Sequence, residues 1–243
     1  MIPTPKFKSA NIRNGALLID SHGSDDGYIF AASGTKTDKK LKLRIAKDQK
    51  LLNYDLNNTG KYDIFPLQLG NGRYQITLYE NILGKEYKPI GSASLYAKLK
   101  SDDAPFLIPN QYVNYDESSD FVKVADALCD GIGKADSFYK ICNYIKTHFQ
   151  YDYIRAVTVK AGVLPNIKDA IKKHMGICQD LSALTVAMLR SQGIPAMLEI
   201  GYADRQYHAW VKADIDGKKV LFDPTKEITM SVPVKRYRVE REY

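Results

Sequence analysis

The stretch GICQDLSALTVAMLRSQGIPAMLEIGY, residues 176–202, decides the fold of the second half of this chain. Residues 178–192 are largely apolar and end at Gly193, which predicts a buried helix. Residues 196–202, 207–213 and 219–222 have the apolar and aromatic character of strands. An Asp216-Gly217 turn separates the last two segments, so we expect them to pair as an antiparallel hairpin.

Upstream of this stretch the apolar residues recur with the period of a helix. The spacing predicts helices over 120–132 and 137–149, with Asp120 and Ser137 as N-caps and glycines at 131 and 133 between them. A shorter helix is expected over 167–174, whereas residues 151–165 follow no regular period. Helices followed by strands indicate an α+β domain, which we place at residues 104–243.

The first hundred residues follow a different pattern. Short alternating segments are separated by turns rich in Gly, Asn and Asp, with a turn roughly every 8 to 12 residues. This pattern predicts an all-β, immunoglobulin-like sandwich over residues 1–103, with a positioning or binding role. About seven strands are expected, at 16–19, 28–32, 41–46, 51–55, 62–67, 73–79 and 90–99.

Composition and charge exclude several classes of protein. With 243 residues, 44% hydrophobic and 26% charged, the chain is neither collagen-like nor disordered. The longest apolar run, residues 181–189, is shorter than the roughly 18 residues of a membrane-spanning helix. The net charge of +7 is diffuse, and the basic stretch 36–44 alternates with leucines like a half-buried strand. Because no nucleic-acid-binding motif accompanies it, we expect no nucleic-acid partner.

The chain has three cysteines, so any single disulfide leaves one thiol free. Cys129 and Cys142 are predicted as buried apolar positions, with a disulfide between them left open for an exported protein. Residues 1–10 contain no apolar segment of signal-peptide type. Two locations therefore stay open: the cytoplasm, or an extracellular or cell-surface site if an export signal is missing from this chain.

One cysteine, one histidine and one aspartate occupy positions that suit acyl-group chemistry. Cys178 opens a predicted helix, where free amides and the helix dipole favour a thiolate. His208 lies in the strand 207–213 and shares a strand face with Trp210. Asp223 ends the next strand, so the predicted hairpin brings it beside the strand of His208. Cysteine chemistry on acyl groups needs a thiol, a base, a carboxylate that orients the base, and amide donors.

Five ordered motifs resemble the transglutaminase-like superfamily, whose members share a papain-like cysteine-protease core. The resemblance covers residues 139–225 and implies that Cys178 is the nucleophile, His208 the general base and then acid, and Asp223 the residue that orients His208. The motifs are Gly176-Ile177-Cys178-Gln179-Asp180, Gly193-Ile194-Pro195-Ala196, Gly201-Tyr202, His208-Ala209-Trp210-Val211 and Phe222-Asp223-Pro224-Thr225.

The expected activity is attack on a peptide or protein amide through a thioester, ending in hydrolysis or acyl transfer. A cell-envelope protein is one candidate substrate. For the oxyanion we expect the Cys178 amide and a second donor, with Gln150 and Tyr151 as candidates, and Trp210 either as a wall of the cleft or as a core residue. No cofactor is expected, and no metal, because paired ligand motifs are missing from the sequence.

Two alternatives remain open at this point. One is a catalytically silent binding module of the same fold, acting at an anionic surface. The other is a basic surface module for anionic polymers, whose binding would depend on salt and survive replacement of Cys178.

Overall fold

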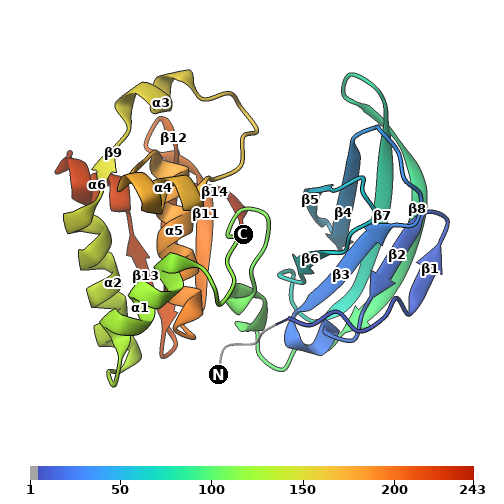
Figure 1. Cartoon of the computed structure of the whole chain (residues 1–243), viewed down its shortest axis with the longest axis horizontal. Coiled ribbons are helices and arrows are strands. Elements are labelled where there is room, and N and C mark those ends of the chain that lie inside the picture. The colour runs from blue at the N-terminus through green and yellow to red at the C-terminus, as the bar shows by residue number, and fades with distance from the viewer. Residues whose placement is uncertain (1–4) are drawn as a thin grey trace. The chain divides into compact units, whose positions relative to one another are not determined.

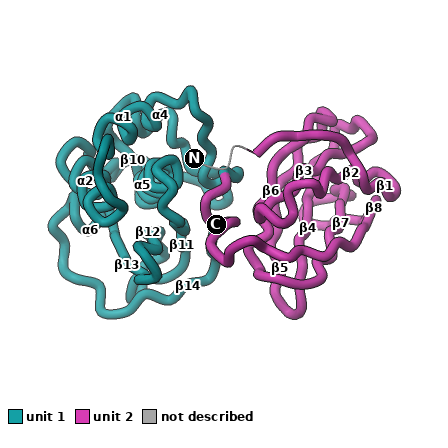
Figure 2. Tube along the Cα trace, turned by 90° about the horizontal axis from the view of Figure 1, so that it is seen from below, with its two compact units in different colours: residues 1–2, 109–243 teal, residues 3–108 magenta. Residues whose placement is uncertain are grey.

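The computed structural model describes residues 5–243. The described chain forms two compact units that divide between Ile108 and Pro109 (Figure 2). Residues 104–108 belong to the first unit, because Pro105 packs directly against Gly27. The units differ in architecture: strands make up nearly all of the regular structure of the first, whereas in the second a group of helices packs against a sheet (Figure 1).

The first unit contains two antiparallel sheets of four strands each, within the part of the chain that the structure describes. Seven strands follow the predicted segments, and the additional strand is β1, a three-residue segment that pairs with β2. One sheet has the order β1 (Ile12–Asn14), β2 (Leu17–Asp20), β3 (Tyr28–Ser33) and β6 (Asp63–Pro66). The other has the order β5 (Lys50–Leu56), β4 (Leu41–Lys47), β7 (Gly72–Leu83) and β8 (Glu86–Ala97). Two 3₁₀ turns, Ser24–Asp26 and Ala104–Leu107, complete the unit.

Apolar strand faces form the core of this unit. In β4 the side chains of Leu41, Leu43 and Ile45 are buried and alternate with partly exposed residues, as the sequence predicts for its basic stretch. Tyr54 of one sheet contacts Phe65 of the other edge to face, with ring centroids 5.3 Å apart. The two sheets therefore pack against each other through apolar side chains.

A buried helix lies at the centre of the second unit. This helix, α5 (Cys178–Ser191), is buried from Asp180 to its end and packs on two strands of a four-stranded antiparallel sheet. The order of that sheet is β13 (Lys218–Phe222), β12 (Gln206–Ile215), β11 (Ala196–Ala203) and β14 (Tyr237–Glu242). Four helices also contact α5, namely α1 (Asp120–Cys129), α2 (Lys134–His148), α4 (Ile167–Lys173) and α6 (Pro224–Thr229) (Figure 1). This arrangement confirms the predicted mixture of helices and antiparallel strands.

Several local features differ from the sequence expectations. Ser119 rather than Asp120 precedes α1, and α2 begins at Lys134 after Gly133, three residues before Ser137. Residues 151–165, expected to be irregular, contain the short helix α3 (Tyr153–Thr158). Two short strands, β9 (Gln150–Tyr151) and β10 (Met175–Gly176), pair in parallel just before α5. None of the described helices has the length and apolar character needed to cross a membrane.

Candidate functional site

The fold brings Cys178, His208 and Asp223 together from three different elements. Cys178 is the first residue of α5, His208 lies in β12, and Asp223 is the residue just before α6. Nε2 of His208 donates to the Asp223 carboxylate, at 2.9 Å from Oδ2 and 3.1 Å from Oδ1. The Cys178 side chain lies near the same imidazole, close enough to help raise the pKa of His208.

Local chemistry explains how Asp223 reaches His208. The predicted hairpin is confirmed: β12 and β13 pair with Val211 opposite Phe222, and the turn between them uses positive φ at Asp216 and Gly217. Asp223 follows Phe222 directly, and its side chain caps α6 by accepting from the Lys226 amide at 3.1 Å. The cap turns the carboxylate away from the strand direction and toward His208.

The environment of the pair favours an imidazolium beside a carboxylate. Burial by itself would lower the pKa of His208, but its hydrogen bonds with Asp223 and Cys178 outweigh burial and raise the pKa to about 9. Burial would likewise raise the pKa of Asp223, yet the hydrogen bond from His208, the Lys226 amide and Tyr237 together lower it. His208 is therefore protonated and Asp223 ionised at neutral pH.

Asp180 holds the beginning of α5 in place. Its side chain is fully buried and accepts from the Ile177 amide at 3.0 Å and from the Asn166 amide at 2.8 Å. The guanidinium of Arg155, in α3, forms an ion pair with the same carboxylate. Sequence reasoning missed Arg155, because its partner lies 25 residues away and α3 carries no strong periodic signal. Asp180 thus links three segments next to Cys178.

The two oxyanion candidates lie in β9, which pairs with the strand just before Cys178. Gln150 is exposed, and alternation along the strand puts its side chain on the opposite face from Tyr151. Tyr151 is partly buried and close to Cys178: burial first, and then the neighbouring side chains of Cys178, Tyr153 and two aspartates, raise its pKa to about 12. No described residue accepts a hydrogen bond from the Cys178 amide. These positions favour Tyr151 over Gln150 as the second hydrogen-bond donor to the oxyanion, beside the Cys178 amide.

Trp210 lies behind His208 in the interior. Its indole is fully buried, its ring centroid is 6.4 Å from that of His208, and its N–H donates to the buried carboxylate of Glu199. A fully buried indole has no surface to offer a substrate, so we assign it to the support of His208. Tyr237, which the sequence reasoning did not single out, packs against Trp210 at 4.7 Å between ring centroids.

The other two cysteines are buried, and all three cysteines are free thiols. Burial raises the pKa of the Cys129 and Cys142 thiols above the usual value. In the described part of the chain, no group of three or more histidine, cysteine or acidic side chains is arranged to hold a metal ion.

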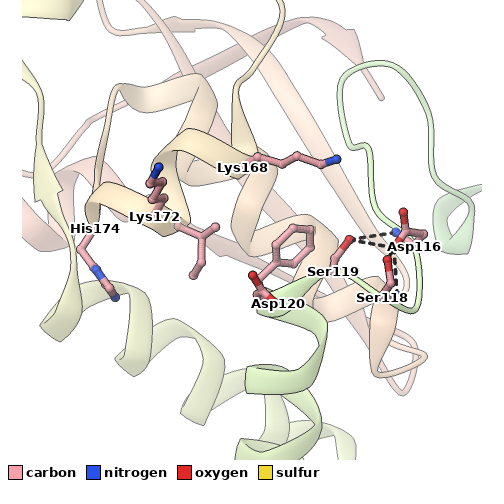
Figure 3. A pocket seen from close by; sticks show the side chains of 9 residues that line it. Asp116, Ser118, Ser119, Asp120, Lys168, Lys172 and His174 are labelled. Atoms are coloured by element: carbon pink, nitrogen blue, oxygen red, sulfur yellow. Dashed lines mark hydrogen bonds between the residues drawn. The ribbon is translucent and has the colours of Figure 1, made fainter.

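A hollow of about 530 Å³ lies elsewhere on the second unit, between the start of α1 and α4 (Figure 3). Acidic and hydroxyl side chains lie toward one side and lysines and a histidine toward the other (Figure 3), and Phe121 and Ile171 also line the hollow. None of the three residues Cys178, His208 and Asp223 lines it. The polar lining is Asp116, Ser118, Ser119, Asp120, Lys168, Lys172 and His174.

Comparison with known proteins identifies the second unit. Residues 126–224 match the family model of the transglutaminase-like superfamily. An uncharacterised protein from Mycobacterium leprae is 32% identical over 104 residues; the match covers 38% of this chain and 36% of the relative, so this chain spans only about a third of that protein.

Two solved structures are similar at low sequence identity. A proposed cysteine protease from Cytophaga hutchinsonii is 19% identical, with 81% of this chain and 70% of that chain covered and a TM-score of 0.44. The periplasmic domain of TgpA from Pseudomonas aeruginosa, bound to ethylmercury, is 13% identical, with 93% and 79% covered and a TM-score of 0.40. The family-model match shows that residues 126–224 are similar to the transglutaminase-like superfamily.

Proposed function

We propose that the protein is a cysteine-dependent enzyme that acts on peptide or protein amides, with Cys178, His208 and Asp223 as its catalytic triad. The observation that carries this proposal is the position of the buried His208 imidazole, which is hydrogen-bonded to the Asp223 carboxylate and lies near the Cys178 thiol. A thiol next to an imidazolium and at a helix N-terminus is the usual setting of a nucleophilic cysteine.

The reaction begins with a Cys178 thiolate and a His208 imidazolium. The sulfur attacks the amide carbonyl carbon, and the tetrahedral intermediate collapses to a thioester as His208 gives its proton to the leaving amine. Water or a second amine then attacks the thioester and loses a proton to His208, which releases the acid or the new amide and restores the thiolate. Asp223 keeps the imidazole oriented in both steps.

Two donors are available for the developing oxyanion. The Cys178 amide is free at the start of α5, and the Tyr151 hydroxyl stays protonated through the neutral range because its pKa is about 12. Donors directed at the oxyanion rather than at the ground-state carbonyl lower the barrier. We therefore assign these two groups to the oxyanion hole.

The surface beside the triad favours substrates with apolar residues near the reacting amide. On α3 the side chains of Tyr153, Ile154 and Val157 are 67%, 78% and 85% exposed, unusual for large apolar groups on a six-residue helix. Tyr153 contacts Tyr151, and Arg155 is paired with Asp180, so this helix is fixed beside Cys178. A peptide lying across α3 would cover these side chains.

The test is an activity screen whose products distinguish hydrolysis from acyl transfer. Peptide amides that differ only in an apolar or charged residue beside the reacting amide are incubated with the protein, with and without a small primary amine, and the products are identified by mass spectrometry. The proposal predicts products with the wild type, preferentially from apolar peptides, and none with Cys178→Ala. Turnover that survives Cys178→Ala would refute the mechanism, and binding without turnover would support the silent module.

A further inference from the structure

We infer that Tyr237 is a positioning residue for the active site: its hydroxyl fixes the Asp223 carboxylate that orients His208. This inference rests on the proposed function and extends it to a residue outside the matched family region. That region ends at residue 224, thirteen residues before Tyr237 (237 − 224). The Tyr237 hydroxyl donates to Oδ2 of Asp223 at 2.9 Å.

The hydroxyl of Tyr237 completes the set of donors around Asp223. Oδ1 accepts from the Lys226 amide at 3.1 Å, and both oxygens face Nε2 of His208. Lys226 and Tyr237 therefore hold one carboxylate oxygen each, and the plane of the carboxylate is fixed. A carboxylate with only one of these donors could rotate and lose its alignment with the imidazole.

The backbone brings Tyr237 to this position through the edge strand β14. This strand pairs with β11 so that Tyr237 is opposite Ala203, and the pairing shifts register between Ile200 and Gly201. The two strands are so close that a Cβ on Gly201 would collide with the Arg238 carbonyl oxygen. Gly201 thus permits the approach that places Tyr237.

Asp204 fixes the beginning of the same strand. Its carboxylate accepts from the Lys235 amide at 3.2 Å and from the Arg236 amide at 3.0 Å, just before Tyr237. The ring of Tyr237 then packs on Trp210, which itself lies beside His208. The residue therefore contacts both supports of the imidazole: Asp223 through its hydroxyl and Trp210 through its ring.

The two contacts can be separated by substitution. Tyr237→Phe removes only the hydroxyl and keeps the ring on Trp210, whereas Tyr237→Leu removes both. Tyr202→Phe is the matched control, because it removes a hydroxyl from the neighbouring strand β11 at a residue that contacts Tyr207 and Arg238. The readout is the rate of Cys178 alkylation by iodoacetamide across pH, measured by peptide mass mapping, which needs no substrate.

The inference predicts a specific change in Tyr237→Phe. Loss of a hydrogen bond to a charged group slows Cys178 alkylation at pH 6 about tenfold. Because Asp223 loses a donor to its ionised form, its pKa rises, and the acid limb of the alkylation profile moves to higher pH. Tyr202→Phe keeps the wild-type profile. In an Asp223→Ala background, Tyr237→Phe has no further effect, because the hydroxyl acts only through that carboxylate.

Three outcomes would overturn the inference. A wild-type profile in Tyr237→Phe with slow alkylation only in Tyr237→Leu would reduce the residue to a packing role. A Tyr237→Phe effect that persists in the Asp223→Ala background would show that it does not act through Asp223. If Tyr237→Phe does not fold, as judged by circular dichroism, the hydroxyl is needed for the fold and the positioning role is refuted. His208→Ala keeps the proposed function separate: if it also leaves alkylation unchanged, the triad itself fails.

Discussion

Each unit of the protein contains a histidine next to an aspartate, and the two pairs differ in setting. In the sandwich, Nδ1 of His22 lies 2.6 Å from Asp20, two residues away, and the His22 side chain is 38% exposed. In the second unit, His208 and Asp223 come from different elements, fifteen residues apart, and the His208 side chain is 3% exposed. The hydrogen bonds are similar, but only His208 also contacts a thiol.

From this difference we expect burial and a third partner, rather than the pair itself, to distinguish the proposed catalytic histidine, His208, from His22. The Asp20 carboxylate accepts hydrogen bonds from the backbone amides of Lys8 and His22, so it organises a turn. Asp223 accepts hydrogen bonds from the first turn of α6, from a tyrosine hydroxyl and from an imidazole. All of these groups lie in the interior, where burying a charge has a high free-energy cost unless the charge is paired. Replacing the matching residue in each of the two His–Asp pairs tests this contrast.

The largest expected effect is on activity. His208→Ala and Cys178→Ala each lower turnover of an amide substrate by a factor on the order of a million, because the nucleophile and its base act as a unit. His22→Ala leaves turnover unchanged. Rates measured on folded variants, with circular dichroism as the control for folding, decide between these results. Equal losses in His22→Ala and His208→Ala would remove the distinction between the pairs.

Replacing the aspartates should have a smaller but still unequal effect. Asp223→Asn keeps the size of the side chain but removes its charge, and we expect a loss of turnover smaller than that of His208→Ala by roughly two orders of magnitude. Asp20→Asn should lower the unfolding midpoint and leave turnover of the folded protein intact. Steady-state rates and urea unfolding on both variants provide the comparison. Turnover that falls in Asp20→Asn but not in Asp223→Asn would contradict the different roles of the two aspartates.

Ion pairs in the two units should also differ in their contribution to the free energy of unfolding. Arg155→Ala leaves the fully buried Asp180 without its charge partner and should lower the free energy of unfolding by about 3 kcal/mol or more. The matched change in the sandwich, Lys42→Ala, removes the half-exposed pair with Asp55 and should cost less than about 1 kcal/mol. Urea unfolding at one pH measures both. A loss in Lys42→Ala as large as in Arg155→Ala would show that burial does not set the cost.

The smallest expected effect is the pH dependence of stability. The pKa of His208 is about 9 in the folded protein and its ordinary value is 6.5. Its stabilising contribution is therefore complete below pH 6.5 and lost as pH rises through about 9. The gap in unfolding free energy between wild type and His208→Gln should shrink between pH 6 and pH 10. A His208 gap that widens over this range would reverse the sign and contradict the ion pair.

The parts of the site that the sequence predicts are those with local signals. The Asp216-Gly217 turn sets the hairpin, and the apolar run ending at Gly193 predicts the buried helix that begins at Cys178. The turn predicts that Asp223 lies beside the strand of His208, and the family resemblance adds Cys178 to them. Helix starts are less certain from sequence because neighbouring polar residues compete as caps, which explains the shift from Asp120 to Ser119.

The supporting residues depend on contacts that are distant in sequence. Strand β14 is a charged segment with weak strand character, and it pairs with a strand 34 residues earlier at Tyr237 and Ala203 (237 − 203). Helix α3 has only six residues; Asp152 caps it and the buried Asp180 holds it. No periodicity within these segments reveals such partners. Tyr237 and Arg155 therefore emerge only from the structure.

The most direct test of the central claim is the rate of iodoacetamide alkylation of each cysteine against pH, resolved by peptide mass mapping, in the wild type and in His208→Ala. We expect Cys178 to react fast well below pH 8 only when His208 is present, and the buried Cys129 and Cys142 to react slowly in the folded protein. If Cys178 reacts like the two buried cysteines, or keeps its rate without His208, then no ion-paired nucleophile exists and the domain is better described as a binding module.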